Sequence, residues 1–179
     1  NHNRRIDIQG KHYHLTPFFR DSAFYYSYSE SKDEELVGQI ASSVFNTKSH
    51  QLAIETAHTP LFNRLNGAVG INGNYRDLKT SGYDAYLPSV LTKEYGIYWV
   101  ESLNLSPFEI TAGYRKGYTH HHLNIPDNYN SGRGQGSNLQ NRHFDTSANT
   151  LALSFTPIDE WTLKLQKNIS YRAPEINEL

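Results

Sequence analysis

The sequence predicts an all-β protein, an antiparallel sheet that forms about eight strands of a transmembrane β-barrel. Three observations lead to this prediction: alternation of apolar with polar residues, aromatic residues near strand ends, and connections that are short on one side and long on the other. In residues 161–171 the odd positions are mostly apolar and the even positions are polar. Such a segment is longer than an ordinary strand of about 5–6 residues and suits a strand that crosses a bilayer at a tilt.

The composition agrees with a membrane barrel better than with a helical membrane protein. Aromatic residues make up 13% of the 179 residues, and no apolar run is long enough for a transmembrane helix. Phe108, Trp161 and Tyr171 lie near strand ends, as in the two interfacial girdles of a barrel. Composition alone also fits a soluble β-sandwich with a tyrosine-rich surface. The net charge of −1 offers no basic surface for nucleic acid, and the absence of Cys excludes thiolate sites.

Pro, Gly and clusters of polar residues interrupt the alternating pattern and divide the chain into eight strand-like segments. They are Arg5–Leu15, Ser22–Ser29, Leu36–His58, Leu65–Tyr75, Lys93–Leu105, Phe108–Tyr118, Phe144–Phe155 and Trp161–Tyr171. Four short connections carry Pro, which cannot donate to a strand ladder, and they are residues 16–19, 59–64, 105–107 and 156–160. The other connections are longer and polar, namely Glu30–Glu35, Arg76–Thr92 and Thr119–His143. We therefore expect short turns in the periplasm and long loops outside the cell.

The alternation assigns side chains to two faces. Leu163, Leu165, Ile110 and Val69 are expected to face lipid. The expected lumenal side chains are Asn66, Asn72, Asn74, Glu109, Arg115, Lys164, Gln166 and Asn168. Leu36–His58 is too long for one crossing, so its upper part is expected to rise above the membrane or to be irregular around Asn46–His50. Because the chain begins and ends in patterned sequence, we interpret residues 1–179 as part of a larger barrel domain.

The segment Tyr171-Arg172-Ala173-Pro174-Glu175-Ile176-Asn177-Glu178-Leu179 resembles the R-A-P-x-x-x-E-L box of TonB-dependent outer-membrane receptors. Other pieces agree in order. Residues 52–61, a Gly-rich strand with Gly67, Gly70 and Gly73, Ala85-Tyr86-Leu87-Pro88, and residues 95–101 are similar to successive parts of the same family. The resemblance covers most of the chain from about residue 31 to residue 179. Within the family, the likeness is greatest to the zinc-regulated, zinc-uptake branch.

The resemblance implies a Gram-negative outer-membrane receptor for energy-coupled uptake of a metal ion or metal complex, with zinc as the expected ligand. A complete protein would have about 22 strands around an N-terminal plug and would be driven by an inner-membrane TonB-type energy-transducing complex. These 179 residues contain no counterpart of the plug domain or of the energy-coupling box. Alternatives are a haem or siderophore receptor, and a non-transporting surface-binding barrel fragment or scaffold.

Four of the nine His lie in the connection Thr119–His143, which makes it the candidate metal site. The candidate ligands are His120, His121, His122, His143 and Asp145, since imidazole and carboxylate both bind Zn²⁺. Adjacent side chains of an extended segment cannot all point at one centre, so one or two of the three consecutive His would act with His143 or Asp145. The alternative is a solvated polar loop.

The remaining features carry less functional information. His12 and His14 are expected to be interfacial residues, and His58 is expected to have a structural role at its turn. The sequence contains no G-x-S-x-G, H-E-x-x-H, Walker or dinucleotide-binding motif, so no enzyme is predicted.

Overall fold

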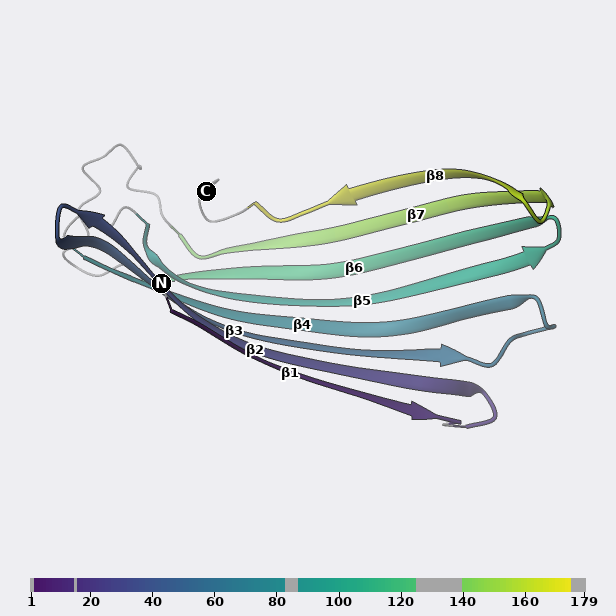
Figure 1. Ribbon diagram of the computed structural model, residues 1–179, viewed down its shortest axis with the longest axis horizontal. Coiled ribbons are helices and arrows are strands. Elements are labelled where there is room, and N and C mark those ends of the chain that lie inside the picture. The colour runs from purple at the N-terminus through teal and green to yellow at the C-terminus, as the bar shows by residue number, and fades with distance from the viewer. Residues whose placement is uncertain (1, 15, 83–86, 125–139, 175–179) are drawn as a thin grey trace.

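The protein is a single sheet of eight antiparallel strands in sequence order (Figure 1). The computed structural model describes residues 2–14, 16–82, 87–124 and 140–174. Its strands are β1 (His2–Tyr13), β2 (Phe19–Val37), β3 (Ile40–His58), β4 (Leu65–Ser81), β5 (Ser89–Leu105), β6 (Phe108–Asn124), β7 (Arg142–Ile158) and β8 (Trp161–Tyr171). In the described residues, we find no helix with the length and apolar character needed to cross a membrane. The all-β prediction is confirmed.

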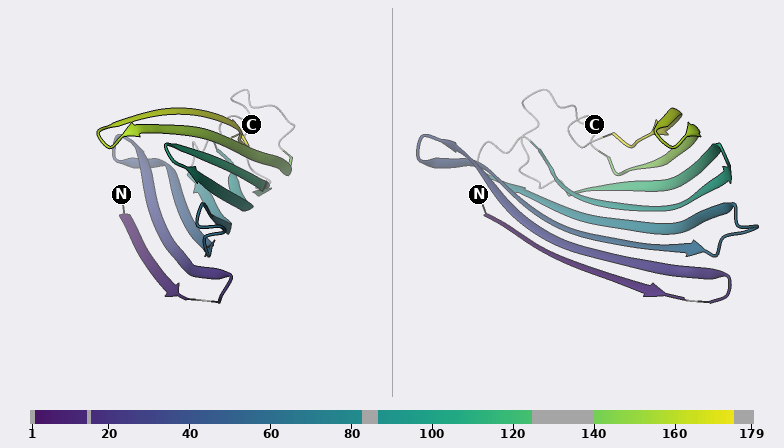
Figure 2. Two further views of the ribbon diagram at one scale, coloured as in Figure 1. Left: turned by 90° about the vertical axis from the view of Figure 1, so that its right-hand side faces the viewer. Right: turned by 45° about the vertical axis from the view of Figure 1, so that its right-hand side comes forward.

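The sheet is curved like part of a barrel wall (Figure 2). Its two faces differ in burial, because a curved sheet crowds side chains on its concave side and spreads them on its convex side. Ser27, Ala68, Thr92 and Thr119 are buried and all lie on the face that carries the polar side chains. Large apolar side chains of the opposite face remain exposed, with 72% of Leu165 accessible. We call these the polar, concave face and the apolar, convex face.

The strand register confirms the predicted separation of side chains. Val69 of β4 pairs with Trp99 of β5, and Ile110 of β6 pairs with Leu153 of β7, so apolar side chains share one face from strand to strand. From β3 to β6 the register continues without a shift. Because successive side chains alternate, this unbroken register keeps the expected lipid-facing and lumenal residues of these four strands on opposite faces.

Most strands are longer than the sequence predicted, whereas β8 has the expected bounds and the expected segment Leu36–His58 divides into the end of β2, a turn and β3. The expected loop Glu30–Glu35 is wrong. Those residues belong to β2, which continues to Val37, and a two-residue turn at Gly38 and Gln39 leads into β3. The irregular stretch expected around Asn46–His50 is instead regular strand. The 19 residues of β3 fit the other expectation, that this strand is longer than one crossing of a bilayer requires. Residues 30–35 are all polar, so the alternation of apolar with polar residues is lost there, yet backbone pairing continues.

The other two long connections are also shorter than expected. β4 runs to Ser81 and β5 starts at Ser89, which leaves seven residues of Arg76–Thr92 between them. β6 runs to Asn124 and β7 starts at Arg142, so both ends of Thr119–His143 are strand. Residues 83–86 and 125–139 lie outside the described residues, as do residues 175–179 of the R-A-P segment.

The turns at the other end of the sheet are joined to one another. Thr59 donates its backbone N–H to Phe18 O over 2.8 Å and its hydroxyl to Pro17 O over 2.8 Å. Thr156 N similarly donates to Pro107 O over 2.8 Å. These bonds satisfy turn groups that the strand ladders leave free, and they hold neighbouring hairpins at one level.

Candidate functional site

The five predicted metal ligands lie on paired strands, and they divide between the two faces. His120 of β6 is directly opposite His143 of β7, and both lie on the apolar face with His122 and Asp145. His121 lies on the polar face, where it is 2% exposed and its Nδ1 is 3.0 Å from the Thr92 hydroxyl. Its ring also meets the ring of Phe144 edge-on, at a centroid distance of 5.9 Å.

This arrangement corrects the expected position of the histidines without testing zinc binding itself. Asp145 is 3.4 Å from Lys116 Nζ, which occupies one oxygen of that carboxylate. Within the described part of the chain, no three His, Asp or Glu side chains gather closely enough to hold a metal ion. Of the five candidate ligands, His120 and His143 are the two that lie directly opposite each other. Cβ atoms of directly opposite residues are about 4.5–5.5 Å apart, so these two form the compact part of the candidate site.

Three hydrogen-bonded pairs cover the middle of the polar face, and we call this group the central polar network. It consists of Glu55, Asn72, Asn74, Glu94, Tyr98 and Arg115, from strands β3 to β6. Tyr98 donates its hydroxyl to Glu55 Oε2 over 2.9 Å, and Asn74 Nδ2 donates to Glu94 Oε2 over 2.8 Å. Arg115 Nη2 donates to Asn72 Oδ1 over 3.3 Å. Asn72, Asn74 and Arg115 are among the predicted lumenal residues; Glu55, Glu94 and Tyr98 were not predicted.

Gly70 permits the contact between Tyr98 and Glu55. A Cβ atom on Gly70 would come within 2.2 Å of the Tyr98 ring, so the ring lies directly over the glycine backbone on its way from β5 to β3. Only a residue without a side chain leaves that path open. The network therefore presents fixed carboxylate oxygens and a guanidinium side by side, a surface that can exchange hydrogen bonds with a polar or charged solute.

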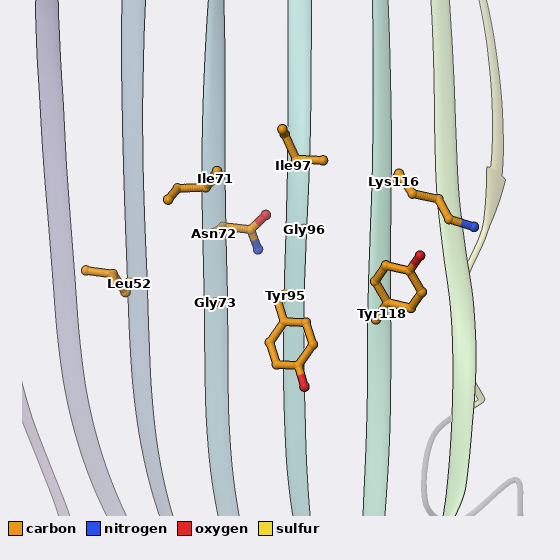
Figure 3. A pocket seen from close by; sticks show the side chains of 9 residues that line it. All are labelled: Leu52, Ile71, Asn72, Gly73, Tyr95, Gly96, Ile97, Lys116 and Tyr118. Carbon is orange, nitrogen blue, oxygen red and sulfur yellow. The ribbon is translucent and has the colours of Figure 1, made fainter.

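The apolar face has a hollow over Gly73 with a volume of about 410 Å³ (Figure 3). Its side-chain walls are Leu52, Ile71, Ile97, Tyr95, Tyr118 and Lys116. Strands β3 to β6 supply these residues, so the hollow lies within the sheet and is not formed at either edge. Gly73 forms the floor, because the large side chains around it have no counterpart at that position.

Two lysines and two histidines border the hollow. Lys116 Nζ lies 5.5 Å from the centroid of the Tyr118 ring. The next row across the sheet pairs Lys93 of β5 with His120 of β6 and His120 with His143 of β7. Lys93 is an exposed residue. The hollow is therefore bordered by Lys116, which pairs with Ile97, and beyond Tyr95 and Tyr118 by Lys93 and two imidazoles.

His58 and Glu101 form a charged pair across the apolar face near the opposite end of the strands. His58 Nε2 is 3.0 Å from Glu101 Oε2, and its Nδ1 is 2.7 Å from Thr59 O. A carbonyl and a carboxylate both accept hydrogen bonds, so a doubly protonated His58 ring satisfies both contacts. The pair passes over Gly67, where a Cβ atom would come within 2.3 Å of the Glu101 carboxyl group. His58 thus has the expected structural role, with a partner that the sequence did not reveal.

Beyond the histidine row, β2 and β3 carry ordinary surface charges. Lys48 Nζ is 3.4 Å from Glu30 Oε1, and the lysine charge lowers the pKa of Glu30 below its usual value. Glu30 therefore stays ionised at neutral pH.

Comparisons with known proteins give a structural neighbour but no sequence relative. No family model matches the chain, and no curated protein matches it. A search of solved structures finds the copper transporter OprC, with a TM-score of 0.66 and 11% sequence identity. The match covers 97% of this chain and 32% of that chain. At this identity the likeness concerns the fold, and the chain spans about a third of the length of the neighbour.

Proposed function

We propose that this chain forms part of the wall of an outer-membrane receptor that takes up a metal ion or a metal complex. The observation that carries the proposal is a single sheet with a continuous apolar face and a continuous polar face, similar along nearly its whole length to part of a copper transporter. Such a sheet suits lipid on its convex side and a water-filled lumen on its concave side. In this arrangement the short turns lie in the periplasm and the histidine row lies near the outer surface.

The central polar network is the part of the wall that meets the cargo. Glu55 and Glu94 are held in fixed positions by Tyr98 and Asn74, so they can receive a hydrated cation without rearranging. Arg115 balances their charge and can contact an anionic metal complex. Passage requires a plug that rearranges, and the energy for this step is proposed to come from a TonB-type complex of the inner membrane.

Zinc is the proposed cargo, and copper is the second candidate because the structural neighbour is named a copper transporter. The 179 residues contain nine His and neither Cys nor Met. Thioether and thiolate ligands favour Cu(I), whereas imidazole and carboxylate suit Zn²⁺ and Cu(II). The side chains of this wall therefore match Zn²⁺ or Cu(II) better than Cu(I). Haem and a siderophore remain the alternatives, as does a surface-binding role without transport.

Uptake by the full receptor tests the proposal. Cells that express it should accumulate radioactive zinc or copper only when the inner-membrane energy source is intact. Replacing both network carboxylates, as Glu55→Gln with Glu94→Gln, should lower uptake, because two charges that face the cargo are lost. Lys167→Gln, on the apolar face, is the matched control and should leave uptake unchanged. Uptake of haem or a siderophore with no uptake of either metal ion would refute the metal-ion assignment.

The predicted zinc site is tested separately by titration calorimetry of the full receptor. A variant with Ala at His120, His121, His122 and His143 should bind zinc more weakly than the unaltered protein, and affinity should fall below about pH 6 as free imidazoles become protonated. An unchanged affinity in the variant would show that these histidines are not zinc ligands.

A further inference from the structure

We propose that two copies of the full receptor associate through the apolar faces of β5 to β8. Lys167 of each copy meets Glu101 of the other, and the two Asn149 side chains meet between these contacts. The inference rests on the proposed outer-membrane location and goes beyond the uptake function, because it concerns the face of the wall that the cargo does not touch. It is carried by polar side chains that lie among apolar ones and that complement each other when a second copy is placed against them.

Lys167 and Asn149 interrupt the apolar surface near the middle of their strands. Lys167 is exposed on the apolar face of β8, between Leu165 and Ile169, and its direct neighbour on β7 is Leu151. Asn149 is exposed on the same face, opposite Ile169. Within the described residues, neither side chain takes part in a hydrogen bond or an ion pair. An ammonium and an amide that face hydrocarbon without a partner are unfavourable, so protein suits this part of the face better than lipid.

The complementary charge lies on the same face, at Glu101 of β5. Strand pairing places Glu101 in one row with Lys167, and the residues between them are Ala112 and Leu151. Each charged residue lies one and a half strand spacings, about 7 Å, from the line between β6 and β7. The Glu101 side chain is 30% exposed, and its carboxyl oxygens lie 3.0 and 3.2 Å from His58 Nε2. A carboxylate has about four acceptor positions, so Glu101 can accept a further hydrogen bond.

A two-fold axis along the membrane normal, at the line between β6 and β7, makes this face complementary to itself. Such an axis places Glu101 of one copy opposite Lys167 of the other and repeats the contact on the other side. The strands are tilted, so the two groups differ in depth, and the flexible lysine side chain spans that difference. Asn149 lies beside the axis, where two amides can each donate to the other. A second copy therefore supplies the anion, the cation and the amide that this face requires.

The surface around the axis allows close approach. A hollow of about 530 Å³ lies over β5 to β8, with the small side chain of Ala112 between the larger ones of Trp99, Tyr114 and Leu151. Tyr114 is 38% exposed and adjoins the hollow. Its ring can fill part of the hollow of the second copy, which buries apolar surface of both copies.

The first test is chemical crosslinking of the full receptor in outer membranes. Asn149→Cys should give a covalent dimer with a thiol-specific reagent about 10 Å long, which matches the spacing of two packed sheets. Ile8→Cys is the matched control, because Ile8 is 53% exposed on the apolar face of β1, away from the proposed axis. It should give no dimer. Equal crosslinking at the two positions would show random collision, and no crosslinking at Asn149 would remove the proposed axis.

The second test reverses the charges and measures association of the full receptor in lipid vesicles by energy transfer between differently labelled copies. Lys167→Glu should raise the dissociation constant of the dimer about a hundredfold, since two charge-assisted contacts are lost and each is worth about tenfold. Glu101→Lys should have a similar effect. Mixing the two variants should restore association, because each lysine then faces a carboxylate again. Lys164→Glu, on the polar face of the same strand, is the matched control and should leave association unchanged.

Glu101→Lys also removes the partner of His58, so the folding of each variant is checked by urea unfolding in vesicles. The crosslinking test and Lys167→Glu do not depend on that variant. Unchanged association of Lys167→Glu, or an equal loss in Lys164→Glu, would overturn the inference. Two folded variants that fail to associate when mixed would show that the two residues are not in contact. The polar face of each copy is unaltered in the dimer, so uptake is a separate measurement and the two proposals can fail separately.

Discussion

Gly67 lies beneath the pair formed by His58 and Glu101. Whether Gly67→Ala stabilises or destabilises the protein should depend on the presence of the Glu101 side chain. An added Cβ would come within 2.3 Å of the Glu101 carboxyl group and displace it from His58. A hydrogen bond between charged groups is worth about 1.5–3 kcal/mol, and the two side chains are only 19% and 30% exposed. Ala in place of Gly inside a strand returns about 0.5–1 kcal/mol. Gly67→Ala should therefore lower the free energy of unfolding by about 1–2 kcal/mol.

In a Glu101→Ala background the carboxyl group is absent, so only the favourable contribution of Ala remains. Gly67→Ala should then raise the free energy of unfolding by about 0.5–1 kcal/mol. The assay is equilibrium urea unfolding of the full protein in lipid vesicles, for the four proteins of the double-mutant cycle. A loss of the same size in both backgrounds would show that Gly67 does not act through Glu101.

Three further changes test other parts of the structure. Leu165→Arg should cost about 2–4 kcal/mol of unfolding free energy in vesicles, because it places a charge in lipid, whereas Gln166→Arg should cost far less; equal costs would contradict the two-faced wall. Gly70→Ala should displace Tyr98 and lower the free energy of unfolding by about 1–3 kcal/mol, measured by comparing urea unfolding of the variant and the unaltered protein. No loss of stability would mean that the Tyr98 ring can move aside freely. An epitope tag inserted at Gly38 should be labelled on intact cells and one at Asn63 should not; the reverse pattern would invert the topology.

The middle of each strand could be predicted from the sequence because its pattern follows from local geometry. Successive side chains of a strand point to opposite faces, so alternation of Leu163 and Leu165 with Lys164 and Gln166 identifies both the strand and its exposed face. The register confirms this for β8, whose Leu165 pairs with Leu153 of β7. No knowledge of distant residues is needed for such a prediction.

The ends of the strands and the contacts between them could not be predicted in this way. Glu30–Glu35 and most of residues 119–124 carry polar residues at successive positions, so the sequence looks like a loop although the backbone remains paired. The partner of His58 is Glu101, which is 43 residues away along the chain. Only the register of β3, β4 and β5 brings the two together, and periodicity within one strand does not specify it.

The uninterrupted register from β3 to β6 has a consequence for how the chain can change in length. In the part of the chain that the structure describes, register shifts occur near hairpin ends, at Phe19/Asp21 and Glu35/Leu36 between β2 and β3 and at Phe155/Ile158 between β7 and β8. Loss of one residue inside β4 or β5 would turn every following side chain of that strand to the other face, placing charged residues on the apolar face and leucine on the polar face. Viable insertions and deletions should therefore gather in the connections, or come in pairs within a strand. Loops can therefore vary in length by any number of residues, whereas a strand of the wall can gain or lose residues only in even numbers.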